Sequence, residues 1–89
     1  MANGNDKVFF FCNDVKAEVT EDVLTGAQIK AAAKQVIPNL DLAHELVLQG
    51  SGHEADTVIA DGTSVTLTHG HGEGPKHFFT RPPTNFGSL

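Results

Sequence analysis

The constraint that most limits how this chain can fold is a single well-marked helix start at Thr25. Thr25 and Gln28 have the spacing of a capping box, in which each side chain accepts a hydrogen bond from the other residue's backbone N–H. Leu24 and Ile29 flank the cap at the spacing of a hydrophobic staple, and Pro38 limits how far the helix can continue. The sequence therefore predicts one helix that begins after Thr25.

The predicted helix is amphipathic. Its expected packed face has the i, i+3, i+4, i+7 spacing and consists of Ile29, Ala32, Ala33 and Val36. We expect Lys30 and Lys34 to lie on the opposite, solvated side of the helix.

Short β-rich runs lie on both sides of this helix. Before it, VFFFC and the alternating VKAEVT predict a hairpin that turns at Asn13 and Asp14. After it, HELVL predicts a strand, DTVIADGTSVTL predicts short β pieces around an Asp61–Gly62 turn, and KHFFT predicts the last strand. This order, ββαββ(β), favours an α+β roll with a mixed sheet of four to five strands and one main helix. If the first and last strands lie side by side in parallel, this is the β-grasp arrangement.

Composition limits the classes of function. The length of 89 residues favours one domain, which we place at 7–80 between a flexible leader at 1–6 and a flexible C-terminal tail at 81–89. The net charge of −5, with only six Lys and Arg, argues against nucleic acid as a main partner. The chain has neither a membrane-length apolar run nor a secretory signal, so we expect a cytoplasmic location and no membrane partner.

Cysteine and histidine residues are the remaining candidates for chemistry. Cys12 lies inside an apolar run, where a thiol is usually a small core residue. His69 and His71, with His77 and His53, offer imidazoles for a metal, but glycines surround the first two and hold ligand geometry poorly. Since no catalytic motif stands out either, we expect no metal site, no cofactor and no enzyme activity in this chain.

Nearly the whole chain, from about residue 7 to 87, is similar to a known family. The run VFFFCNDVKAEVTEDVLTGAQIKAAA, followed by HELVLQGSG, DGTSVTL and the closing HFFTRPP, resembles the bacterial ubiquitin-like β-grasp domains of the multiubiquitin family. The resemblance implies a protein modifier that is joined through its C-terminus to target proteins by an isopeptide bond. It also implies three partners: an activating enzyme, a conjugating enzyme and a processing peptidase.

The tail RPPTNFGSL contains the residues that this chemistry needs. We expect Gly87 to carry the reactive carbonyl, because a residue without a Cβ can enter a narrow enzyme channel, and we expect cleavage between Gly87 and Ser88 to expose it. Residues 81–87 would span roughly 23 Å when extended. The residues expected to contact an enzyme groove are Arg81, Pro82, Pro83 and Phe86.

The outer face of the sheet is the expected recognition surface for partners. In LVLQG, Val47 points away from the core when its two leucine neighbours point inward. The same alternation turns one phenylalanine of HFFT outward, and VFFFC can extend the surface. We therefore expect Val47, Phe79 and Phe9 to form an exposed apolar surface.

Two alternatives to a modifier stay open. A β-grasp sulfur carrier would use the same acyl adenylate but deliver sulfur from a terminal thiocarboxylate. A non-covalent binding module would use the sheet face alone, with no chemistry at the tail.

Overall fold

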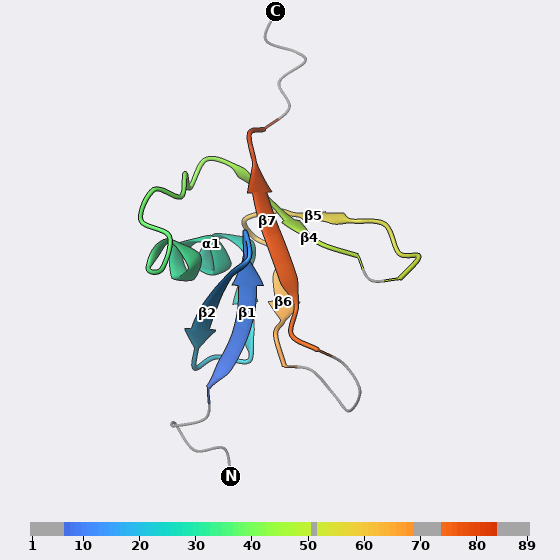
Figure 1. Cartoon of the computed structure of the whole chain (residues 1–89), viewed down its shortest axis with the longest axis horizontal. Coiled ribbons are helices and arrows are strands. Elements are labelled where there is room, and N and C mark those ends of the chain that lie inside the picture. Colours follow the sequence, from blue (N-terminus) through green and yellow to red (C-terminus); the bar gives the residue numbers. More distant parts are fainter. Residues whose placement is uncertain (1–6, 51, 69–73, 84–89) are drawn as a thin grey trace, which may run out of the picture.

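The computed structural model describes residues 7–50, 52–68 and 74–83, and its elements follow the predicted order with one additional short strand before the helix (Figure 1). These elements are β1 (Val8–Cys12), β2 (Val15–Val19), β3 (Val23–Thr25), α1 (Gly26–Lys34), β4 (Glu45–Leu48), β5 (Thr57–Ile59), β6 (Ser64–Thr66) and β7 (His77–Arg81). Five strands form one mixed sheet in the order β2-β1-β7-β4-β5, in which only β1 and β7 are parallel neighbours. This arrangement confirms the predicted α+β roll of the β-grasp kind.

A tight turn joins β1 to β2. The ladder runs from Val8↔Val19 to Cys12↔Val15, which leaves only Asn13 and Asp14 between the strands. Both have positive φ, 51° and 68°, as a type I′ turn requires and as Asn and Asp tolerate. The predicted hairpin is therefore confirmed, with its turn at the predicted pair.

The helix α1 begins as predicted but ends earlier than expected. The Thr25 hydroxyl accepts from the Gln28 backbone N–H at 3.3 Å, and the Gln28 side chain accepts from the Thr25 backbone N–H at 2.9 Å. After Lys34 the chain tightens, because Gln35 and Val36 donate to carbonyls three residues back. Val36 thus lies beyond the helix and is exposed, so its predicted place on the packed face is wrong.

Replacing Thr25 by alanine is expected to lower the free energy of unfolding by about 1 kcal/mol, because the Gln28 N–H loses its acceptor. Urea unfolding of Thr25→Ala measures the effect. The matched control is Thr20→Ala, at an exposed threonine outside any helix or strand. Equal losses in the two variants would contradict a stabilising cap.

The predicted solvation of Lys30 is also wrong. The residue is only 6% exposed, and its ammonium donates to the carbonyls of Leu42 at 2.9 Å and His44 at 3.0 Å. Its third partner is the Asp61 carboxylate, at 2.9 Å. The loop before β4 supplies the two carbonyls, so Lys30 joins α1 to that loop and to the turn between β5 and β6.

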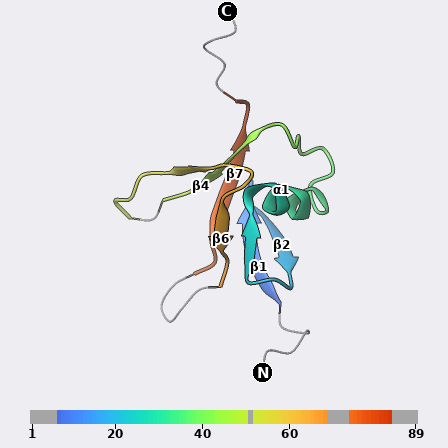
Figure 2. The same ribbon diagram turned by 180° about the vertical axis from the view of Figure 1, so that it is seen from behind.

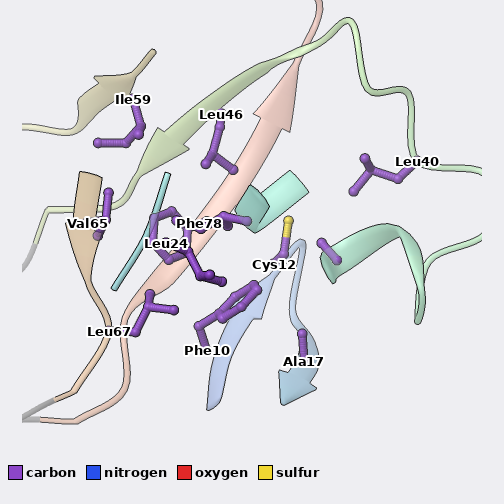
Figure 3. Close-up of a cluster of buried hydrophobic side chains, with 12 residues drawn as sticks. Phe10, Cys12, Ala17, Leu24, Leu40, Leu46, Ile59, Val65, Leu67 and Phe78 are labelled. Atoms are coloured by element: carbon purple, nitrogen blue, oxygen red, sulfur yellow. The ribbon is translucent and has the colours of Figure 1, made fainter. Parts of the chain in front are cut away.

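The core lies between α1 and one face of the sheet, called here the inner face (Figure 3). Phe10 of β1 and Phe78 of β7 meet there edge to face, with ring centroids 5.6 Å apart. The strands β3 and β6, of which β3 was not predicted, add Leu24 and Val65 to the same cluster. Figure 2 shows the molecule from behind, with α1 in front of the sheet. Figure 1 therefore shows the opposite, outer face of the sheet.

Candidate functional site

The strand β7 leads the chain toward its C-terminal tail from the centre of the sheet. It pairs in parallel with β1 and antiparallel with β4, so neighbouring strands lie along both of its edges. Figure 1 shows it running through the middle of the molecule toward the C-terminal end. Because releasing β7 would break two ladders, this strand gives the tail a rigid starting point.

Asn13, in the turn after β1, forms hydrogen bonds to β7 beyond the last residue pair of the β1–β7 ladder. Its backbone N–H donates to the Phe78 carbonyl at 3.0 Å. Its side-chain oxygen accepts from the Thr80 backbone N–H at 3.1 Å, and its amide nitrogen donates to the Thr80 hydroxyl at 3.0 Å. The Asn13 side chain thus takes the place of a strand partner, a role that the turn signal alone did not reveal.

Arg81 is the last residue of β7 rather than the first residue of the tail. Its register partner is Glu45, and the Arg81 Nε lies 2.7 Å from the Glu45 Oε2. The predicted boundary at 81 is therefore wrong by one residue, because the ladder and this ion pair continue to Arg81. Pro82 and Pro83 follow, exposed and outside any strand, as expected of residues that cannot donate to a ladder.

Some predicted site residues lie outside the described residues. These are Phe86, Gly87 and Ser88 of the tail, and the pair His69 and His71. Their roles stay predictions. Within the described ranges, no group of three or more His, Cys, Asp and Glu is placed to hold a metal ion. The helix that the structure describes is too short to cross a membrane.

Val47 lies on the outer side of β4, but it is not exposed. Only 1% of the residue is accessible. Its register partners are Phe79 of β7 and Val58 of β5, so apolar residues flank it on both sides. The prediction of Val47 as an exposed recognition residue is therefore wrong. Solvent reaches this row of residues at Val58, which is 49% exposed, and at the half-buried Phe79.

Two aromatic rings of β1 lie beside this row on the outer face. Phe9 and Phe11 are half-buried and meet edge to face, with centroids 6.0 Å apart. The His77 ring stacks on Phe11 at 4.9 Å with an interplanar angle of 8°. The Lys16 Nζ lies 4.5 Å from the centroid of the Phe9 ring. Phe9 and Phe79 thus keep the outward positions predicted for them, whereas the contribution of His77 depends on the β1–β7 register and was missed.

Cys12 is buried in the core, and burial raises the pKa of its thiol from 9.0 to about 11. At about pH 8 we expect a thiol reagent to label the folded chain about 100-fold more slowly than the urea-unfolded chain, because the thiolate is rarer by that factor. Because the pKa is higher in the folded state, the contribution of this thiol to the free energy of unfolding is complete below pH 9. It is lost as the pH rises from 9 through about 11. Equal labelling rates in the two states would contradict a buried, protonated thiol.

Comparisons of the chain with protein-family models, with curated proteins and with solved structures gave no match. The functional proposal therefore depends on the fold, on the end of β7 and on the outer face of the sheet.

Proposed function

We propose that this chain is a ubiquitin-like protein modifier. In this proposal a peptidase cleaves after Gly87, and partner enzymes then activate the Gly87 carboxylate with ATP and join it to target proteins. The observation that supports it is the way β7 ends. The strand is held as far as Arg81 by its neighbours and by Glu45, and two exposed prolines follow at once.

A fixed starting point determines how far the reactive group can reach. The segment from Pro82 to Gly87 has six residues. In an extended conformation these residues span about 20 Å. This reach is slightly shorter than the sequence predicted, because Arg81 belongs to the strand. An activating enzyme that holds the sheet must place its ATP within that distance of the end of β7.

The proposed reaction begins with an oxygen of the Gly87 carboxylate. This oxygen attacks the α-phosphorus of ATP, which forms an acyl adenylate and releases pyrophosphate. A nucleophile of a partner enzyme then attacks the acyl carbon and releases AMP. Finally an amine of the target takes the acyl group, which releases the partner's nucleophile and a proton. Glycine suits these steps because no Cβ crowds the carbonyl that is attacked.

The residues of this chain contribute recognition rather than catalysis to the proposal. Cys12 is buried and protonated, so we assign the transfer nucleophile to a partner enzyme. The Arg81–Glu45 bond uses Nε, which leaves the two terminal guanidinium nitrogens of Arg81 as donors for a carboxylate of an enzyme groove. Arg81 thus keeps its proposed role at the start of the tail, from a position fixed on the sheet.

Incubation of the chain with ATP and the activating enzyme that this proposal requires tests the proposal. A chain that ends at Gly87 is used together with the full-length chain, so that a failure of processing is not mistaken for a failure of activation. We expect pyrophosphate release and an acyl-enzyme bond that contains Gly87. A terminal thiocarboxylate would instead identify a sulfur carrier. No ATP-dependent product from either chain would favour a non-covalent binding module, for which the aromatic outer face is the supporting observation.

A further inference from the structure

Three of the six phenylalanines of this chain lie on the outer face of the sheet: Phe9, Phe11 and Phe79, all half-buried. Within the described residues, α1 and the β3–β6 pair contribute their buried side chains to the core on the inner side. No described helix or strand therefore covers the outer face. The half-buried rings of Phe11 and Phe79 retain apolar area that a partner can remove from water.

The charge of this face differs in sign from that of the rest of the chain. Beside the rings lie three cations and two carboxylates, a formal charge of +1: Lys7, Lys16, Arg81, Glu18 and Glu45. The other described residues carry three lysines against seven carboxylates, a formal charge of −4. The cations of this face can therefore pair with an acidic partner, whereas the other described residues carry an excess of carboxylates.

The Lys16 cation of this face lies next to its apolar rings. Lys16 is the register partner of Phe11, and its ammonium lies 4.5 Å from the centroid of the Phe9 ring. The Glu18 carboxylate lies 3.7 Å from the Lys16 ammonium and 4.0 Å from that of Lys7, so one carboxylate serves two cations. A ligand that carries both a carboxylate and an apolar side chain can therefore meet an ammonium and a ring at the same place.

From this combination we propose that the outer face binds an acidic peptide segment of a partner protein, in which apolar side chains stand among Asp and Glu residues. The binding site consists of Lys7, Phe9, Phe11, Lys16, His77, Phe79 and Arg81. Nucleic acid fits this face less well, because three cations with two carboxylates among them neutralise few phosphates. The binding is non-covalent and does not depend on the chemistry of Gly87.

Titration of the isotope-labelled full-length chain with synthetic peptides tests this site by NMR. The probe is a short peptide of Asp and Glu interrupted by leucines. One control peptide has lysines in place of the acids, and the other has serines in place of the leucines. We expect the probe to shift amide signals of β1, β2 and β7, and each control peptide to bind about tenfold more weakly or worse.

Two variants of the chain locate the site, each with a matched control. Phe11→Ser and Lys16→Glu are each expected to weaken binding of the probe about tenfold. Leu42→Ser removes an exposed apolar side chain elsewhere, and the pair Gln35→Glu with Asn39→Asp changes the charge by the same amount at exposed positions after α1. Both controls are expected to bind like the unmodified chain. If Phe11→Ser does not fold, the shift map of the unmodified chain decides the location.

Several results would overturn the proposal. These are shifts confined to α1 and its loops, equal binding of the lysine or serine peptide, and binding of a single-stranded oligonucleotide in preference to the probe. Self-association through the same face without peptide binding would also overturn it. Repeating the titration with Gly87→Trp separates this site from conjugation, because peptide binding is expected to persist when attachment to targets is lost.

Discussion

Replacing Lys30 by methionine is expected to lower the free energy of unfolding by about 2–4 kcal/mol. Methionine keeps the apolar length of the side chain but removes the ammonium that binds Leu42, His44 and Asp61. Two partly buried carbonyls then lose their donor. For a domain of this size the loss corresponds to a fall in Tm of roughly 10–25 °C. Thermal and urea unfolding measure it.

The matched control is Lys34→Met, one turn further along α1. The Lys34 ammonium also donates to two carbonyls, those of Pro38 and Leu40, but water reaches this side chain more easily. We expect a loss of about 1 kcal/mol or less there. A larger loss in Lys34→Met than in Lys30→Met would contradict the view that Lys30 is the main polar link between α1 and the loop before β4.

Replacing Gly87 by tryptophan is expected to reduce attachment to target proteins by at least about 100-fold, because a large side chain would displace the carbonyl in the enzyme channel. Chains that end at residue 87 are compared, so that cleavage before Ser88 does not limit the reaction. The measurement is the rate of formation of denaturation-resistant conjugates in the presence of ATP and the partner enzymes.

The control for this substitution is Thr84→Trp, which adds the same bulk three residues before the proposed carbonyl. Most of the attachment is expected to remain in that variant. An equal loss of attachment in both variants would mean that the partner enzymes recognise the whole tail rather than Gly87. Unchanged attachment in Gly87→Trp would contradict the role of this residue.

Local signals predicted much of the fold. The Asn13–Asp14 turn and the capping box at Thr25 each depend on residues close together in the sequence, and both are confirmed. These elements in this order left few ways to cover one face of a sheet with one helix. Parallel pairing of the first and last strands at the centre of the sheet was one of these few arrangements, and the structure has it between β1 and β7.

Three of the errors share a cause in contacts between residues far apart in the sequence. Val47 is covered because β4 aligns it between Phe79 and Val58, and no pattern within LVLQG shows that alignment. Lys30 is buried because a loop more than ten residues away in sequence supplies its carbonyl acceptors. Arg81 stays in the strand through Glu45, on the other side of a long connection. Each depends on a pairing that sequence periodicity does not contain.

Correcting these errors also changes which residues form the candidate recognition surface. The sequence predicted Val47 as an exposed part of it, whereas the structure buries Val47 and leaves Val58, the Lys16 cation and the half-buried rings of β1 and β7. The same face and the tail meet at Arg81, which belongs to β7 and precedes Pro82. A partner that holds the outer face is therefore placed close to the start of the tail.

The peptide left on a modified target after trypsin digestion tests the central claim most directly. Trypsin does not cut before proline, so the bond after Arg81 survives and the remnant runs from His77 to Gly87, HFFTRPPTNFG. Targets are purified under denaturing conditions through a tag at the N-terminus of the chain and then analysed by mass spectrometry. We predict this remnant, joined through the Gly87 carbonyl to an amine of the target. A branched peptide that ends at another residue, or tagged protein without any branched peptide, would contradict the claim.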